Sequence, residues 1–311
     1  MLSKKADMCL IRYVKYNKLV VTAVVISILA LTGCNKVEVE STGGFWLKMG
    51  DNSIVATSDI DFYDVSTHMI YLKKALPYLK KVEKNYGGIM SVYVDDEEIY
   101  KCSFHSRIRS YLPNGEYISC NPSFYPEDVI CINFLQIIDL AGNPRFTDHR
   151  SDERIIAALK KNHLYHEGLR CEIRSVDVLN EKLVLNIELY NPDTFDYYHL
   201  DPDKMGIGLF HYFTNGLYFR NDQYQSFNHQ ETVIHPEPWN SWKKEWLALI
   251  KSGERKNISI TYRHFEAIPA GKYKMSFCFP GISWTSQKNR MLNGGRIWMG
   301  DICTEKDITI Y

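Results

Sequence analysis

The residue types in this chain that are best suited to catalysis or metal binding are its ten histidines and its clustered carboxylates. One stretch, His163-Leu164-Tyr165-His166-Glu167, places two histidines three residues apart with a glutamate beside the second. Zinc proteases instead carry HExxH, with the glutamate beside the first histidine, or the inverted HxxEH. Because the order HxxHE fits neither, we expect solvated polar residues at a helix end here and predict no metal ligands.

Two groups of acidic residues also have suggestive spacings. Asp59, Asp61 and Asp64 lie close together, and glycosidase chemistry would need two such carboxylates to face each other across a cleft. Residues 199–203 alternate oxygen-bearing side chains like the start of a calcium-binding loop, but no glutamate closes the loop at position twelve. We therefore expect both groups to cap turns and loop ends.

No motif for nucleophilic catalysis is evident. The sequence lacks GxSxG, and no cysteine stands in a recognisable protease context. We predict no catalytic residue and no cofactor. The alternative is a cell-envelope hydrolase whose carboxylate and histidine groups, chosen from His68, His105, Asp61 and Asp64, meet in a cleft of the N-terminal region.

A dense run of aromatic residues is the strongest remaining feature. Exposed Trp and Tyr rings stack on sugar faces or anchor protein partners, so we single out Tyr218, Trp239, Trp242 and Trp246 as candidate ligand contacts. The helical spacing of Trp242, Trp246 and Leu249 favours another interpretation, in which a helix within 237–249 packs these rings over a sheet. The whole run comprises Phe210, Tyr212, Phe213, Tyr218, Phe219, Tyr224, Phe227, Trp239, Trp242 and Trp246.

The N-terminus has the composition of a secretory signal. Residues 1–18 carry five basic side chains against one acidic side chain, and the largely apolar run 19–31 follows. As a helix this run would span about 20 Å, which is short of a ~30 Å hydrocarbon core. It ends in Leu31-Thr32-Gly33-Cys34, which resembles the lipobox of bacterial lipoproteins. The alternative is an ordinary membrane helix that ends in cysteine.

The lipobox resemblance implies cleavage after residue 33 and acylation of Cys34, so that the membrane is a partner through this lipid anchor. Asn35 stands where enterobacterial inner-membrane lipoproteins have aspartate, and residues 37–40 are faintly similar to the export signals of Bacteroidetes surface lipoproteins. We therefore expect a signal peptide over 1–33 and a lipidated tether over 34–44, with the protein in the cell envelope at the outer membrane.

The charge balance changes when the signal is removed. The whole chain carries 37 basic and 37 acidic residues, but without residues 1–33 the count becomes 32 against 36, a net charge of −4. A mildly acidic domain has no electrostatic reason to bind nucleic acid or anionic lipid, so we predict no nucleic-acid partner and expect the lipid anchor, not surface charge, to hold the protein at the membrane.

Six cysteines remain in the mature region, and their pairing is open. No CxxC occurs, which argues against a thioredoxin-like site or a zinc ribbon. Cys131 lies in an apolar run and is expected to be a buried thiol, whereas Cys102 and Cys120 flank the turn 113–115 and suit a cross-hairpin disulfide. The six are Cys102, Cys120, Cys131, Cys171, Cys278 and Cys303.

The elements that would position these residues differ between two regions. Over 45–168 the pattern is mixed, and we predict an α+β domain. Its helices are expected at 77–86 and after an N-cap at Ser151, and its strands at 53–57, 69–72, 90–94, 99–104 and 128–140. Over 169–311 the hydrophobic period is two, as in 183–189, 258–262 and 273–279, which predicts a β-sandwich.

The C-terminal region also resembles a known family. Asn191-Pro192-Asp193, then 251–254 before one strand and 268–273 before the next, is similar to bacterial immunoglobulin-like domains. The N-terminal pattern 59–72 is similar to uncharacterised Bacteroidetes-type lipoprotein domains. These resemblances imply an α+β domain followed by an all-β immunoglobulin-like sandwich with an aromatic insertion. They also imply a non-catalytic binding or structural module with a protein or glycan ligand.

Overall fold

The computed structural model describes residues 43–79, 88–120, 125–139, 141, 143–179, 182–239, 241–282 and 290–311. Residues Thr42–Tyr311 form one compact unit. Cys34, the signal predicted over 1–33 and the tether up to residue 42 lie outside the described residues. Within the described ranges, no helix is long and apolar enough to cross a bilayer.

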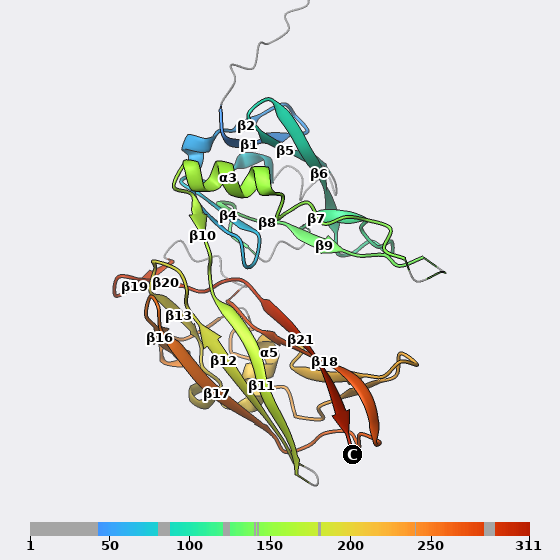
Figure 1. The fold of residues 1–311 in the computed structure, drawn as a ribbon. Coiled ribbons are helices and arrows are strands. Elements are labelled where there is room, and N and C mark those ends of the chain that lie inside the picture. Colours follow the sequence, from blue (N-terminus) through green and yellow to red (C-terminus); the bar gives the residue numbers. More distant parts are fainter. Residues whose placement is uncertain are drawn as a thin grey trace, which may run out of the picture. The chain divides into compact units, whose positions relative to one another are not determined.

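Residues 45–166 form two sheets and a helix (Figure 1). The six-stranded sheet has the order β2-β1-β5-β6-β7-β9, and the four-stranded sheet has the order β10-β3-β4-β8. The strands are β1 (Phe45–Met49), β2 (Ile54–Val55), β3 (Ile60–Asp64), β4 (Met69–Leu72), β5 (Ile89–Val94), β6 (Glu97–Ser106), β7 (Gly115–Cys120), β8 (Val129–Cys131), β9 (Asn133–Leu135) and β10 (Tyr165–His166). A 3-10 turn, η1 (Thr57–Asp59), precedes β3.

The helix α3 (Glu153–Lys161) follows from local signals in the sequence. Asp152 caps it by accepting a hydrogen bond from the backbone nitrogen of Arg154 at 2.9 Å. Lys160 and Lys161 lie in its last turn, where the helix dipole favours positive charge. Its apolar face, which includes the fully buried Ile155, packs against β1, β5 and β10. The predicted helix is confirmed, with its cap one residue later than Ser151.

The prediction of an α+β domain over 45–168 is wrong. In the part of this region that the structure describes, ten strands accompany α3, and only 77–79 of the predicted helix 77–86 can be placed. Residues 80–87 lie outside the described residues. The apolar run 128–140 is not one strand, because β8 joins the four-stranded sheet while β9 joins the six-stranded sheet. Apolar composition marked this run as buried but did not show that it passes from one sheet to another.

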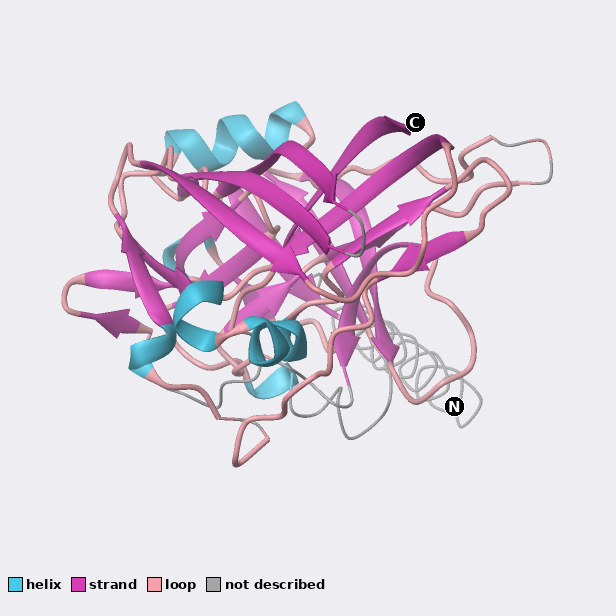
Figure 2. Ribbon diagram, turned by 90° about the horizontal axis from the view of Figure 1, so that it is seen from below, coloured by secondary structure: helices cyan, strands magenta, loops and turns pink. Residues whose placement is uncertain are grey.

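Residues 170–310 form three further sheets (Figure 2). Their orders are β11-β12-β17, β16-β13-β20-β19 and β15-β14-β18-β21. The strands are β11 (Arg170–Leu179), β12 (Lys182–Tyr190), β13 (Tyr197–Leu200), β14 (Leu217–Arg220), β15 (Ser226–Asn228), β16 (Leu247–Ile250), β17 (Arg255–Tyr262), β18 (Gly271–Phe279), β19 (Met291–Leu292), β20 (Gly295–Ile297) and β21 (Ile302–Ile310). Two short helices, α4 (Pro202–Met205) and α5 (Ile207–Phe213), and the 3-10 turn η2 (Lys244–Trp246) complete the region.

The period-two strands are confirmed, but the immunoglobulin-like arrangement is not. An immunoglobulin-like sandwich has two sheets, whereas the described strands of this region divide among three. The third arises because β13 pairs antiparallel with β16 and parallel with β20, which gathers strands from distant parts of the chain. Together with the first region, the described chain is predominantly strand, and Figure 2 shows few helices among the strands.

The helix predicted within 237–249 is also wrong. Among the described residues of this segment, which leave out 240, the single helical turn is η2, and the chain then extends as β16. Trp246, the last residue of η2, is buried directly before β16 and joins a core cluster that includes Phe210 and Phe279. The one-turn spacing of Trp242 and Trp246 suggested a helix, but the two rings pack on the same core without one.

Three apolar clusters underlie the sheets. One contains side chains from Phe45 to Leu164, and a second contains side chains from Leu169 to Ile302. The third joins residues of β3, β4 and β8 to Met299, with Phe195 packed against it. Met299 lies near the end of the chain, yet its side chain packs on strands that stand some 230 residues earlier in the sequence. This contact joins segments that are far apart in the chain.

The cysteines follow the strand pairing. Cys278 and Cys303 lie directly opposite each other in β18 and β21 and form a disulfide. Cys102 and Cys120 are both buried and are not bonded to each other, so the cross-hairpin disulfide that their positions suited does not form. The reason is that β6 and β7 pair in parallel, which places Cys120 opposite Ser106 instead of Cys102.

Candidate functional site

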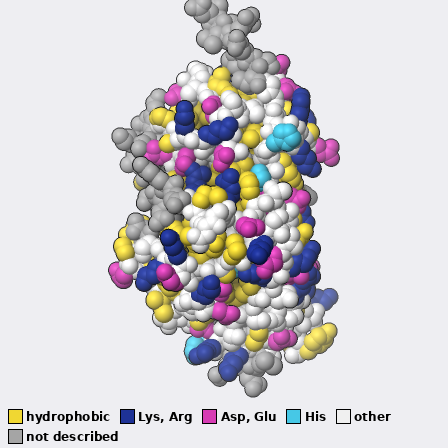
Figure 3. All heavy atoms as spheres, turned by 90° about the vertical axis from the view of Figure 1, so that its left-hand side faces the viewer, with side chains coloured by type: hydrophobic (Ala, Val, Ile, Leu, Met, Phe, Trp, Pro, Cys, Tyr) yellow, Lys and Arg dark blue, Asp and Glu magenta, His cyan; other side chains and the backbone are white. Residues whose placement is uncertain are grey.

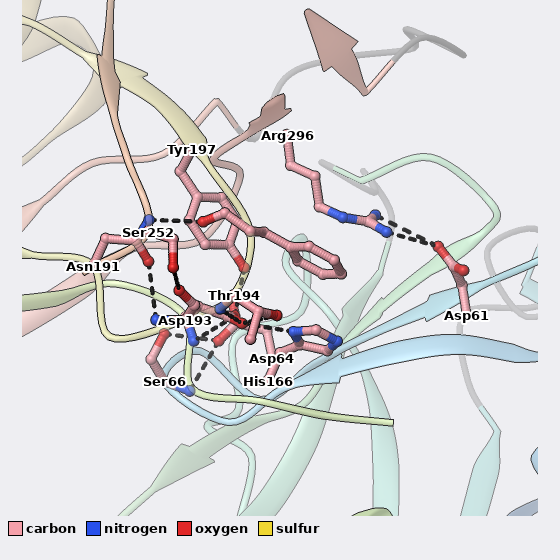
Figure 4. Close-up of polar contacts among 12 residues, drawn as sticks. Asp61, Asp64, Ser66, His166, Asn191, Asp193, Thr194, Tyr197, Ser252 and Arg296 are labelled. Atoms are coloured by element: carbon pink, nitrogen blue, oxygen red, sulfur yellow. Dashed lines mark hydrogen bonds and ion pairs between the residues drawn. The ribbon is translucent and has the colours of Figure 1, made fainter. Parts of the chain in front are cut away.

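A buried carboxylate, Asp193, lies at the centre of a cluster of hydrogen-bonded polar groups (Figure 4). Its Oδ1 is 2.7 Å from Nδ1 of His166 and accepts the backbone N–H of Thr194 at 2.6 Å. Its Oδ2 accepts the hydroxyl of Tyr197 at 2.8 Å and the backbone N–H of Gly168 at 3.1 Å. Both carboxylate oxygens are therefore occupied by protein groups.

The turn after β12 fixes the position of this carboxylate. The side chain of Asn191 accepts the backbone N–H of Asp193 at 3.1 Å and donates to the carbonyls of Phe195 and Ile250 at 2.7 and 3.2 Å. Ser252 donates its hydroxyl to the carbonyl of Asp193 at 2.5 Å. The Asn-Pro-Asp sequence at the strand end thus builds a turn whose polar groups are satisfied internally.

Burial and hydrogen bonding act in opposite directions on Asp193. Burial alone would raise the pKa of its carboxyl, because it disfavours the charged form. The hydrogen bonds from His166, Tyr197 and Gly168 outweigh this effect and hold the pKa below its ordinary value. Asp193 is therefore a stabilised carboxylate and a poor proton donor.

A second buried carboxylate, Asp64, approaches the same cluster from the end of β3. Its Oδ1 accepts the backbone N–H and the hydroxyl of Ser66 at 2.9 and 2.8 Å. Gly168 lies directly against it, since a Cβ added there would be 2.3 Å from Oδ1, and its φ of +67° also requires glycine. Burial raises the pKa of Asp64 to about 6; the bonds from Ser66 oppose this, and the charge of Asp193 adds to it.

The cluster lacks the connections of a catalytic triad. A serine nucleophile would have to bond to the histidine, but the hydroxyl of Ser66 donates to Asp64. The ring of His166 stacks on Phe195 at 4.0 Å and meets the edge of Phe62 at 5.3 Å, so aromatic side chains cover two sides of it. Nor do the described residues contain a group of three or more side chains arranged to hold a metal ion. The arrangement joins β10 to the turn after β12.

The four residues of the hydrolase alternative have separate surroundings. Asp64 belongs to the cluster above, whereas Asp61 is exposed and 3.5 Å from Arg296. His68 is buried, with Nδ1 3.1 Å from the hydroxyl of Tyr63, and burial lowers its pKa to about 4. His105 contacts the edges of Tyr111 and Tyr117. The structure thus engages these four side chains in different local contacts.

The acidic and histidine motifs of the sequence also take structural roles. Asp59 accepts the backbone N–H of Ala56 at 3.0 Å, and Asp201 caps α4 by accepting the backbone N–H of Asp203 at 3.0 Å. His163 takes a positive φ of 56° just after α3, and His166 enters β10. Asp201 confirms the expected turn chemistry in 199–203.

The four candidate aromatic residues differ in exposure. Trp246 is buried in the core, and Trp242 packs half-buried against it. Tyr218 is half-buried within β14, which is paired on both sides. Trp239 is 58% exposed. Trp239 is thus the candidate whose ring is most available to a ligand.

Trp239 ends an irregular stretch of residues 231–239, named here the 231–239 segment. Val233 and Ile234 are also exposed, at 42% and 56%. The segment is held at both ends and in the middle. Ile234 donates its N–H to the carbonyl of Gly208 at 2.9 Å, the hydroxyl of Tyr212 donates to the carbonyl of Trp239 at 2.6 Å, and Pro236 is buried.

Sequence reasoning missed Val233 and Ile234 as surface residues. The feature that could have identified them is that they form a short apolar pair among Thr, His, Glu and two prolines. The hydrophobic residues there follow neither a helical nor a strand period. Gly208 allows the segment to lie close to α5, because a Cβ there would be 2.6 Å from the carbonyl oxygen of Thr232. The sequence alone did not show that this glycine and the segment meet.

Surface charge does not point to a charged ligand as an alternative to these apolar contacts. Acidic and basic side chains are intermingled over the face shown in Figure 3, without a patch of one sign.

No protein-family model, curated protein or solved structure matches this chain. The site geometry is therefore the basis for a functional proposal.

Removing the central carboxylate tests its structural role. We expect Asp193→Ala to lower the free energy of unfolding by about 3 kcal/mol or more, because it leaves several buried donors without an acceptor. Tyr197→Phe removes one donor and should cost about 1 kcal/mol. Urea unfolding at pH 7 measures both. The exposed Asp222→Ala is the control, and an equal cost for Asp193→Ala and this control would contradict the interpretation.

The raised pKa of Asp64 predicts a pH dependence with a definite sign. Its folded-state pKa of about 6 exceeds the ordinary 3.8, so its contribution to stability is full below pH 4 and is lost as the pH rises through 6. An asparagine side chain at this position cannot ionise. Between pH 4 and pH 8, the stability of Asp64→Asn relative to the native chain should therefore rise by about 2 kcal/mol. Urea unfolding at both pH values measures this difference, and a difference that does not vary with pH would refute it.

Proposed function

We propose that this chain is an exported lipoprotein, anchored at the outer membrane through Cys34, that acts as a non-catalytic binding module. The observation that carries the binding role is the 231–239 segment. It presents Val233, Ile234 and Trp239 to solvent while its backbone is held against α5 and Tyr212. The anchor is inferred from the basic head, the apolar run and the LTGC ending of the N-terminus.

The fixed backbone of the segment favours binding. A ligand that contacts a flexible loop must order it, whereas a loop already held by hydrogen bonds loses less entropy on association. An exposed tryptophan also supplies a large contact area with only two rotatable side-chain bonds. Trp239 is therefore the side chain expected to contribute most to affinity, with Ile234 as a second exposed apolar side chain of the same segment.

The neighbours of Trp239 favour a protein ligand over a glycan. A sugar-binding tryptophan works together with polar side chains that hydrogen-bond the hydroxyl groups. Thr232, His235 and Glu237 are exposed in this segment, but its other large exposed side chains, Val233 and Ile234, are apolar. An apolar pair with an aromatic ring is the composition of a protein–protein contact. A glycan that stacks on Trp239 is the alternative.

The hydrolase alternative receives no support from the site geometry. The carboxylates Asp64 and Asp193 are bonded to groups of the protein, and His166 lies between aromatic rings. Chemistry on a substrate would need at least one of these groups to be reachable by it. We therefore assign Asp64, Asp193 and His166 to the stability of the protein.

The proposed anchor has a direct test. Cells that express the full chain are labelled with a palmitate analogue, and we expect the label on the native protein and none on Cys34→Ala. The variant should also retain residues 1–33 and migrate as the larger precursor, because lipidation precedes cleavage in the pathway that the lipobox implies. Cys9→Ala is the matched control and should label normally. Equal labelling of Cys34→Ala and the native chain would contradict the anchor.

The proposed contact surface is tested by site-specific photo-crosslinking in intact cells. A benzophenone amino acid at position 239 should give a discrete adduct, and the same group at the exposed Val178 should not. A second change, Ile234→Asp, should reduce the adduct at 239 about tenfold, since it places a charge in an apolar contact. Protease and glycosidase digestion then distinguish a protein from a glycan. Identical adduct patterns at 239 and 178 would count against the surface.

A further inference from the structure

A second exposed apolar surface lies at the end of the six-stranded sheet where β7 begins. Residues 107–112, named here the tip segment, are six consecutive exposed residues with the sequence Arg-Ile-Arg-Ser-Tyr-Leu. Ile108 and Leu112 are 68% and 70% exposed, and Tyr111 is 51% exposed. These are among the most exposed large apolar side chains in the described chain, and they occur within five residues of one another.

The topology adds a fourth apolar side chain at this end. Gly115, the first residue of β7, pairs with Leu135, the last residue of β9. Leu112 is three residues before Gly115 and the exposed Ile138 is three residues after Leu135, so both lie beyond the same end of these paired strands. Figure 1 shows β7 and β9 side by side, with the loop that follows β9 extending beyond them.

The tip segment has a defined conformation. Arg107 donates its backbone N–H to the carbonyl of Cys120 at 3.1 Å, and Arg109 donates its own to the carbonyl of Ser106 at 3.1 Å. The guanidinium of Arg109 also reaches the hydroxyl of Tyr111 at 3.3 Å and lies over its ring at 5.7 Å. The exposed apolar side chains are thus presented by a braced loop.

The charges around these side chains are mainly basic. Arg107 and Arg109 alternate with the apolar residues, and the exposed Arg145 stands on the loop after β9. Asp139 is on that loop as well, but its Oδ1 accepts the backbone N–H groups of Ala141 and Asn143 at 2.9 and 2.8 Å. The mature chain as a whole has a net charge of −4, but the tip itself is basic and apolar. The tip is therefore complementary to an anionic surface with an apolar interior.

We propose that the tip segment inserts Ile108, Tyr111 and Leu112 into the interface of an anionic lipid bilayer. Arg109 and Arg145 would pair with lipid phosphates, while Ile108 and Leu112 would enter the acyl boundary. Tyrosine suits this depth because its ring is apolar and its hydroxyl is polar. This inference rests on the proposed anchor, since an acylated Cys34 would keep β1 within about 35 Å of the membrane and raise the local lipid concentration.

The test uses a polypeptide of residues 35–311, which contains the whole compact unit Thr42–Tyr311 and no lipid. It is sedimented with vesicles of phosphatidylethanolamine and phosphatidylglycerol in a 7:3 ratio, and with vesicles of phosphatidylcholine alone. We expect binding to the anionic vesicles at 50 mM salt that weakens at 500 mM salt, and at least tenfold weaker binding to the neutral vesicles. The absence of binding to the anionic vesicles would overturn the proposal.

Two variants locate the contact. Ile108→Ser with Leu112→Ser should weaken partitioning about tenfold, as should Arg109→Glu with Arg145→Glu. The matched control, Ile89→Ser with Val178→Ser, removes two exposed apolar side chains elsewhere and should bind like the native polypeptide. An equal loss in this control would refute the assignment to the tip.

Light scattering identifies the competing occupant. If the native polypeptide is a dimer that Ile108→Ser with Leu112→Ser converts to a monomer, the tip is an interface between copies and the membrane proposal is wrong. A thermal melt of each variant shows whether the fold is kept. Because this polypeptide carries no lipid, failure of vesicle binding is distinct from failure of palmitate labelling at Cys34.

Discussion

The burial of Asp193 is the constraint on which the arrangement of this chain depends. A carboxylate removed from water is tolerated only where donors replace the lost solvent. Those donors come from His166 and Gly168, at the end of one set of strands, from Thr194 in the turn after β12, and from Tyr197, the first residue of β13. The Asp193 side chain therefore joins the segment that leaves β10 to the turn after β12 and to the start of β13.

This constraint extends to residues that have no charge. Gly168 has to be glycine because Asp64 lies against it and because its backbone is left-handed. Phe195 follows the turn and packs both on His166 and against the apolar cluster that contains Phe62 and Met299. Arg296 then lies over the rings of Phe62 and Phe195, each at 4.1 Å, and reaches Asp61. A polar centre and its aromatic surroundings thus connect β3, β10, the turn after β12 and β20.

The residues that look most reactive in the sequence are used for structure, and the surfaces available to ligands are apolar. Burial moves the pKa values of His68 and Asp64 in the directions that favour their neutral forms, whereas hydrogen bonds keep Asp193 ionised. Two loops, the 231–239 segment and the tip segment, each carry three of the exposed large apolar side chains. Each is braced by backbone hydrogen bonds, so each offers a preformed contact at low entropic cost.

Local patterns in the sequence determined the parts of the fold that depend on near neighbours. The caps and apolar face of α3, the hairpin of β5 and β6, and the alternation in β12, β17 and β18 were all predictable, because one segment buries one face. The basic, apolar N-terminus and its LTGC ending likewise lead to a predicted anchor without any structure. Tertiary structure alone decided that β6 and β7 run parallel, that 128–135 divides between two sheets, and that Cys278 pairs with Cys303. It also decided which aromatic rings face solvent, and it brought Asp193 to His166. These outcomes depend on contacts between segments far apart in the chain, which no local period encodes.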